Sequence, residues 1–261
     1  MKVAFHTGAW GSDHLFQALQ GISQAGIRFV EVYTDVVPVY EGRADEFLFF
    51  LQKAGLRLSG AYGGGVFTDP VFREADVEGA RAAARWVREA GGGFLILNGG
   101  ESTGDDRRDL ASAAATANAI GTACRLENIQ FCYQPHAGTV VFREDAIRAF
   151  FAATDPETVG ICLDTGHLGE ASADAAELVV DFAARIRVVH LRDLRPKPVF
   201  VGGPFANAGK GTLDLAATAA ALKVAGFGGP VVGFADDPRE DPGKSVKDYA
   251  KYVQAKLHLK P

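Results

Sequence analysis

The sequence predicts a single (β/α)8 barrel, a TIM barrel, that spans residues 1–261. Eight short apolar runs, rich in β-branched and aromatic residues, alternate with segments of helical periodicity. Most of these runs are continuously apolar, which is typical of parallel strands covered by helices. Eight strands in 261 residues favour closure of the sheet into a barrel. An open doubly wound sheet is the second possibility, but no GxGxxG motif follows the first run.

The segments between the strands carry the signals expected of helices. Four of them, including HLFQALQGISQAG and VEGARAAARWVREAG, end in Ala-Gly just before the next strand, where glycine commonly ends a helix. A long irregular loop is expected at 195–213, and loops of that length in compact domains are usually functional. The last 25 or so residues predict a turn and a closing helix. The expected strands are 2–6, 27–33, 56–62, 93–98, 129–134, 159–164, 186–191 and 230–234.

Composition excludes several classes of protein. The chain is 48% hydrophobic with a net charge of −5, and it has no cluster of Lys and Arg that would bind nucleic acid. No apolar stretch approaches the roughly 20 residues that span a membrane. The first residues, MKVAFHTGAWGSDH, turn polar too soon for a signal peptide. Because the three cysteines lie in or near apolar segments, we expect buried thiols and a cytoplasmic location; they are Cys124, Cys132 and Cys162.

Histidines locate the expected active site. Four of the six lie at or just past the ends of apolar runs: His6, His136, His167 and His190. A barrel enzyme builds its site at the carboxyl ends of its strands. Polar groups that converge there suit a small polyhydroxylated ligand, which needs many directed hydrogen bonds and aromatic walls. Further candidates at these ends are Trp10, Glu31, Tyr62, Asn98, Gln134, Asp164, Arg192 and Asp236.

Several of these residues have a structural interpretation as well. Asp164 and His190 end neighbouring strands and offer oxygen and imidazole ligands for Mn²⁺, Co²⁺, Mg²⁺ or Zn²⁺, or else Asp164 caps a turn and His190 is a satisfied strand-end histidine. Glu31 lies within an apolar strand, where a carboxylate is costly unless it is paired or used, and this favours a site role. His6 and His167 remain open between packing and ligand binding.

Three motifs in order, VGICLDTGH, RVVHLRD and GKGTLD, resemble the xylose isomerase-like barrel family. That family holds sugar phosphate isomerases and epimerases, inosose dehydratase and endonuclease IV. The segments GAYGGGVF and PHAGTVV look most like inosose dehydratase relatives. The resemblance implies one divalent metal held by four side chains from strands five to eight. Two of these are Asp164 and His190, whereas Gln134 and Gly233 stand where the family has glutamates.

The expected function is that of a sugar or keto-polyol isomerase or epimerase, which works by metal-assisted proton transfer next to a carbonyl. In epimerases of the family the two glutamates are also the acid and base. Since Gln134 accepts no proton, the base is expected to be Glu31, His136 or Asp236. The metal ligands would be Asp164, His190 and Gln134. The expected substrate contacts are His6, Trp10, Tyr62, Asn98, His167, Arg192 and Lys210.

Three alternatives remain. A lyase of the inosose dehydratase type shares the enolisation step. A barrel that has lost catalysis and only binds a sugar or polyol would account for the altered ligand positions. Endonuclease IV activity needs a richer metal cluster and a basic surface, and the sequence has neither. The resemblance also raises a homodimer as an expectation.

Overall fold

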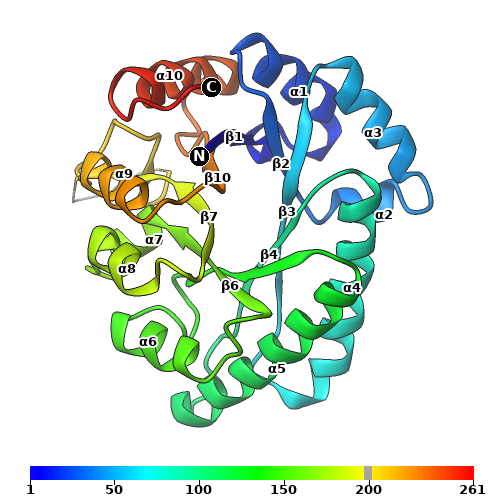
Figure 1. The fold of residues 1–261 in the computed structure, drawn as a ribbon, viewed down its shortest axis with the longest axis vertical. Coiled ribbons are helices and arrows are strands. Elements are labelled where there is room, and N and C mark those ends of the chain that lie inside the picture. The colour runs from blue at the N-terminus through cyan, green and yellow to red at the C-terminus, as the bar shows by residue number, and fades with distance from the viewer. Residues whose placement is uncertain (197–201) are drawn as a thin grey trace.

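A computed structural model describes residues 1–196 and 202–261 of the chain. Its strands form a closed barrel in the order β1-β10-β7-β6-β5-β4-β3-β2, and every neighbouring pair is parallel. Helices ring the strands (Figure 1). The prediction of a (β/α)8 barrel is therefore confirmed.

All eight barrel strands lie within a few residues of the expected positions. The largest difference is in β3, which continues through the glycines at 63–65. A side chain at Gly63 would strike Thr34, so the extended strand needs a glycine there. The strands are β1 (Lys2–His6), β2 (Phe29–Tyr33), β3 (Arg57–Gly65), β4 (Phe94–Gly99), β5 (Gln130–Tyr133), β6 (Val159–Asp164), β7 (Ile186–Leu191) and β10 (Pro230–Gly233).

The helices end where the Ala-Gly signals predict. The four glycines adopt positive φ, as the residue that follows a helix commonly does: Gly26, Gly55, Gly91 and Gly226. The helices are α1 (Leu15–Gln24), α2 (Val36–Val39), α3 (Ala44–Lys53), α4 (Arg73–Glu89), α5 (Asp106–Leu126), α6 (Glu144–Ala152), α7 (Thr165–Glu170), α8 (Ala175–Phe182), α9 (Leu215–Val224) and α10 (Pro242–Ala255).

The expectation that the segment at 195–213 is irregular throughout is wrong at one point. Strands β8 (Asp193–Leu194) and β9 (Phe205–Ala206) form a short antiparallel ribbon there, while residues 197–201 lie outside the described part. Asp193 holds the returning chain, because its carboxylate accepts hydrogen bonds from the backbone N–H groups of Gly211 and Leu213, each at 2.9 Å. A side chain at Gly211 would collide with that carboxylate.

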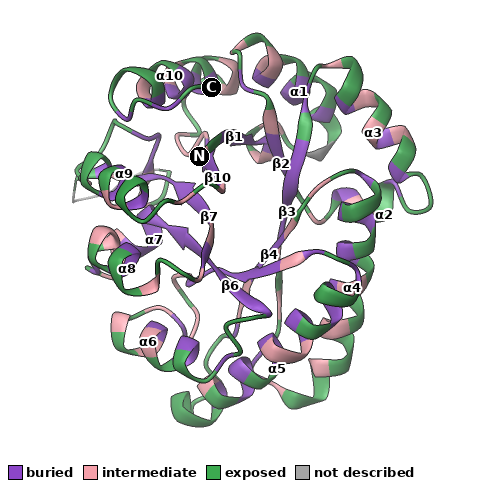
Figure 2. Cartoon of the chain, viewed as in Figure 1, coloured by how far each residue is buried: buried purple, intermediate pink, exposed green. Residues whose placement is uncertain are grey.

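Buried side chains form two layers. The larger packs between the strands and the inner faces of the helices, whose outer faces are exposed (Figure 2). The smaller fills the barrel and includes Cys132, Cys162, Val232 and Phe234. The three cysteines are buried free thiols, as predicted. Within the described ranges, no helix is long and apolar enough to cross a membrane.

Candidate functional site

A ring of polar side chains closes the carboxyl end of the barrel. The strand register pairs Asp164 with His190 and His6 with Glu31, and paired residues of parallel strands face the same side of a sheet. The structure thus brings together seven of the predicted site residues. This polar ring consists of His6, Glu31, Tyr62, Asn98, Gln134, Asp164 and His190, of which only Asn98 is more than slightly exposed.

The two carboxylate oxygens of Asp164 have different hydrogen-bond partners. Its Oδ1 accepts hydrogen bonds from the backbone of Gly166 and His167, at 2.9 and 3.1 Å, and so caps α7. The turn-capping role considered for this residue is therefore present. Its Oδ2 accepts a hydrogen bond from Gln134 Nε2 at 2.7 Å. Burial raises the pKa of Asp164, but the neighbouring His167, Arg192 and His190 outweigh burial and hold it well below its ordinary value.

His190 lies between three polar groups. Its Nε2 is 3.0 Å from Glu31 Oε1, and its Nδ1 is 3.2 Å from Gln134 Nε2 and 3.7 Å from Asp164 Oδ2. Burial lowers the pKa of His190, but Cys162, Glu31 and Asp164 together raise it well above its ordinary value. Glu31 is fully buried against this imidazole, so solvent does not reach its carboxylate.

Arg192 brings a buried cation to the ring. Its Nε lies 3.8 Å from Asp164 Oδ2 and 3.5 Å from Asp236 Oδ1. Its guanidinium carbon lies 3.9 Å from the centroid of the Phe234 ring and 5.2 Å from that of Phe205. Cation–π contacts of this kind are strongest when they are shielded from water. The guanidinium is therefore held by two carboxylates and two aromatic faces.

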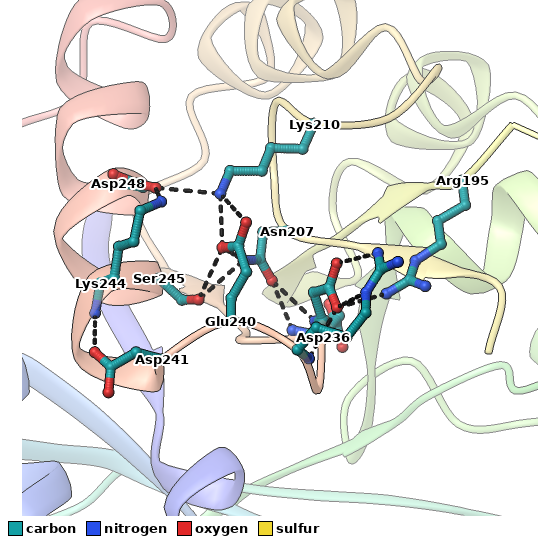
Figure 3. Close-up of polar contacts among 11 residues, drawn as sticks. Arg195, Asn207, Lys210, Asp236, Glu240, Asp241, Lys244, Ser245 and Asp248 are labelled. Carbon is teal, nitrogen blue, oxygen red and sulfur yellow. Dashed lines mark hydrogen bonds and ion pairs between the residues drawn. The ribbon is translucent and has the colours of Figure 1, made fainter. Parts of the chain in front are cut away.

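Asp236 stands at the edge of the ring. Its Oδ2 is buried and has no hydrogen-bond partner among the described residues. Burial raises the pKa of Asp236 to about 6, although Arg192 acts in the opposite direction. The backbone N–H of Asp236 donates a hydrogen bond to Asn207 Oδ1 at 2.7 Å, which fixes the loop that carries it (Figure 3).

His136 and His167 lie against each other nearby, with ring centroids 3.8 Å apart and ring planes tilted by 42°. The backbone N–H of Ala137 donates to His167 Nδ1, which assigns the ring proton to Nε2. That Nε2 is buried and has no hydrogen-bond partner in the described chain. Burial lowers the pKa of both imidazoles, that of His167 to about 3, so both are neutral at physiological pH.

A cavity of about 560 Å³ adjoins the ring at the ends of β4 and β5. Asn98 and His136 are shared between the cavity and the site. Backbone from several glycines forms much of the remaining wall, which lets a small ligand approach the main chain closely. Other lining residues are Thr68, Asp69, Glu101 and Thr139.

Two of the predicted substrate contacts lie elsewhere. Trp10 packs against Phe5, with ring centroids 6.2 Å apart, among residues of the core outside the barrel. Lys210 Nζ forms ion pairs with Glu240 at 2.7 Å and Asp248 at 3.1 Å (Figure 3). Sequence position alone does not reveal the pairing of Lys210, because Glu240 and Asp248 follow it by 30 and 38 residues.

The structure also corrects the position matched to the last expected metal ligand. A Cβ at Gly233 would meet the Tyr249 ring on α10 at 2.5 Å, so this position faces outward. Phe234 instead faces the mouth, where its ring stacks on His6 at 4.9 Å between centroids. Strand alternation is the signal that identifies it, since Val232 points inward and Phe234 is two residues later.

The donor set does not fit a divalent cation. Of the four positions, Asp164 gives a carboxylate that is already bonded to an amide, and Phe234 gives no ligand atom. Gln134 turns its amide nitrogen toward Asp164, and an amide nitrogen is a donor that does not ligate a cation. In the described part of the chain, no three His, Cys, Asp or Glu side chains converge as metal ligands.

Comparisons with known proteins agree with this architecture. A sequence model of the xylose isomerase-like TIM barrel family matches residues 19–255. An inosose dehydratase of Geobacillus kaustophilus is 28% identical over 160 residues, which are 56% of this chain and 52% of that protein. One from Clostridium perfringens is 33% identical over 94 residues, or 36% of this chain and 32% of the relative. The chain thus spans about half or less of the length of these curated relatives.

Solved structures share the fold at low sequence identity. The IolI protein with a bound zinc atom has a TM-score of 0.82 at 15% identity, with 98% of both chains covered. The 3-keto-D-glucoside 4-epimerase YcjR of E. coli has a TM-score of 0.80 at 17% identity, with 98% of this chain and 99% of the other covered.

Proposed function

Because the chain belongs to the xylose isomerase-like TIM barrel family, we propose that it is an isomerase or epimerase of a small keto-sugar or keto-polyol. The reaction moves a proton at the carbon next to the carbonyl. One observation carries the proposal. Asp236 presents a buried carboxylate oxygen, without a hydrogen-bond partner in the described chain, beside the guanidinium of Arg192.

Asp236 fits the role of general base better than the other two candidates. A base is most effective when its pKa lies near the working pH, and burial raises the pKa of Asp236 to about 6. Glu31 is fully buried and already faces His190 as an ion pair at 3.0 Å, whereas Asp236 stands at the edge of the ring. His136 is neutral and lines the cavity, a suitable place for a second proton-transfer group.

The polar ring offers the hydrogen-bonding groups that a polyol needs. Asn98 donates to the Tyr62 hydroxyl at 2.6 Å and also lines the cavity. We place the hydroxyl groups of the substrate against Asn98, His136 and His167, whose Nε2 has no partner in the described chain. Because the residues at the expected metal positions do not fit a divalent ion, the proposed reaction uses none.

A dehydratase is the second candidate, since curated relatives of the chain are inosose dehydratases. The first step would be the same removal of a proton from the carbon next to the carbonyl. The enolate would then re-form the carbonyl and expel a β-hydroxyl group, which takes up a proton and leaves as water. The fate of the enolate therefore distinguishes the two candidates.

A binding protein without catalysis is the third candidate. Its support is the close packing of the polar ring, in which His6, Gln134 and His190 are each 1% exposed or less. In such a protein a sugar would stabilise the fold without reacting.

One experiment separates the three. The protein is incubated with a panel of ketoses and inososes in D₂O and followed by NMR. Deuterium exchange at the carbon next to the carbonyl with a rearranged sugar supports the isomerase. Exchange with a dehydrated product supports the lyase. Thermal stabilisation without exchange for any ligand would overturn both enzymes and support the binding protein. Asp236→Asn should slow exchange by about 100-fold or more if Asp236 is the base.

A further inference from the structure

We propose that Arg192 takes the place of the divalent cation that the family resemblance implies, so that the site works without a metal. The inference rests on the proposed function for its chemistry, but not for its central measurement, which is metal binding. The proposal is supported by the groups that face the mouth of the barrel and by the charges that they carry.

Two of the expected ligand positions carry no negative charge. Gln134 carries no charge and donates its amide hydrogen to Asp164 at 2.7 Å. Phe234 presents an aromatic face where the fourth ligand would lie. Two negative charges that would attract a dication are thus missing, and the remaining carboxylate, Asp164, already has protein partners.

The guanidinium of Arg192 supplies a positive charge beside these positions. Arg192 is permanently cationic, and its Nε lies between the carboxylates of Asp164 and Asp236, at 3.8 and 3.5 Å. The ring of Phe234, the very residue that removes a ligand, carries the guanidinium on its face at 3.9 Å. A dication placed among these groups would be repelled by the guanidinium, whereas the aromatic ring stabilises a cation.

Arg192 is held in place by neighbouring residues. The Oγ1 of Thr165, the first residue of α7, accepts a hydrogen bond from the Arg192 backbone N–H at 2.9 Å and donates one to its carbonyl at 2.6 Å. The side chain is 10% exposed. A cation fixed in this way is preorganised for charge that develops on a ligand.

In the reaction, the base Asp236 accepts the proton from the carbon next to the carbonyl. The electron pair of the C–H bond forms the carbon–carbon double bond, and the carbonyl π electrons move to oxygen. The remaining N–H groups of Arg192 then donate to that negatively charged oxygen. In an isomerisation, Asp236 returns the proton to the neighbouring carbon, while the hydroxyl proton of that carbon passes to the oxygen of the former carbonyl. In an epimerisation, the second proton-transfer group, His136, delivers a proton to the opposite face of the same carbon; Asp236 then releases its proton to water and His136 takes one up, so no added co-reactant is needed.

The central test measures metal binding without reference to activity. The protein is dialysed against EDTA, analysed for metal by mass spectrometry, and titrated calorimetrically with Mn²⁺ and then with Zn²⁺. The wild type is expected to show no stoichiometric, saturable binding of either ion. The double variant Gln134→Glu, Arg192→Met restores a carboxylate and removes the cation, and it is expected to gain binding of about one ion per chain. A wild-type protein that binds one ion per chain, with binding lost in Asp164→Asn, would overturn the proposal.

A second measurement follows Arg192 itself. Arg192→Lys keeps the charge but loses the planar fork, and Arg192→Met loses both. For a substrate found in the D₂O panel, exchange should fall about 10-fold or more in the Lys variant and further in the Met variant, while Arg43→Met on the surface should match the wild type. Exchange in EDTA that survives Arg192→Met undiminished would also overturn the proposal. If no ketose or inosose exchanges, the proposed function fails, and the metal titration still decides the inference.

Discussion

Glu31 Oε1 lies 3.0 Å from His190 Nε2, and neither side chain is exposed to solvent. This ion pair lies among the buried residues of the polar ring and fixes the imidazole that faces Gln134 and Asp164. The ion pair also indicates a structural role for Glu31, which was a candidate base in the sequence. A carboxylate enclosed against a buried histidine is better suited to hold that histidine than to meet a substrate.

Glu31→Gln should therefore lower the free energy of unfolding by about 3 kcal/mol, because removal of one partner leaves the other buried without its counter-charge. Urea denaturation followed by circular dichroism measures the change. The matched control is Glu46→Gln, which breaks the exposed ion pair with Arg43 and should cost at most about 1 kcal/mol. Equal effects of the two substitutions would contradict the structural role of Glu31.

Asp236 should set the acid limb of the pH–rate profile. Its pKa is raised to about 6, and a general base acts only in its ionised form, so proton exchange should decline as the pH falls through about 6. Asp236→Asn should slow exchange by about 100-fold or more. NMR in buffered D₂O between about pH 4.5 and 8 brackets this pKa and gives both quantities.

The neighbouring Asp237 supplies the control for that profile. Its carboxylate is paired with Arg239 at 2.6 Å, and this hydrogen bond holds its pKa well below the ordinary range. Asp237→Asn should keep the acid limb near the pKa of Asp236, about 6. A limb that moves in Asp237→Asn but remains in Asp236→Asn would show that Asp236 is not the base.

The sequence predicts the barrel well because its signals are local and repeated. Continuous apolar runs identify strands buried on both faces, and a glycine after each of four helices marks their ends. The location of the polar ring can be predicted as well, since parallel strands of a barrel end at one rim. Seven candidates meet there for this reason and not because of any single motif.

The features that the sequence did not predict depend on side-chain direction and on distant partners. Gly233 and Phe234 are adjacent, and Phe234 enters the mouth because the register of β10 turns Val232, two residues earlier, into the barrel. Lys210 lies within a family-like motif, yet its charge is taken by Glu240 and Asp248, which come from the far end of the chain. Pairing of this kind leaves no trace in local spacing.

Gly233→Ala tests the outward direction of that position. The added methyl group would press on the Tyr249 ring of α10 at 2.5 Å, and overpacking of a buried site costs about 1–3 kcal/mol. Thermal denaturation should show the loss. Gly228→Ala is the control, because a Cβ there meets no atom within 4 Å, and it should be nearly neutral. A harmless Gly233→Ala would place this residue in the open mouth, against the structure.

Glu127, which directly follows α5, should make the fold sensitive to acid through contacts outside the polar ring. Its buried carboxylate accepts from Arg88 at 2.7 Å, Arg85 at 3.2 Å and Arg81 at 3.4 Å. The hydrogen bond from Arg85, with help from the other two, lowers the pKa of Glu127 in the folded protein. The unfolded chain has a pKa of about 4.3 for this group, so its stabilisation is present above that pH and is lost as the pH falls toward the folded value.

Melting temperatures of wild type and Glu127→Gln, measured from about pH 7 to pH 3, test this linkage. The wild type should be the more stable at neutral pH, and the difference should shrink steadily below about pH 4.3 as the carboxylate takes up a proton. Glu89→Gln is the control, because that carboxylate pairs with Arg88 at an exposed position, 3.3 Å away. A difference between wild type and Glu127→Gln that stays constant over the whole range would mean that packing of the side chain, and not its charge, stabilises the contact between α4 and the end of α5.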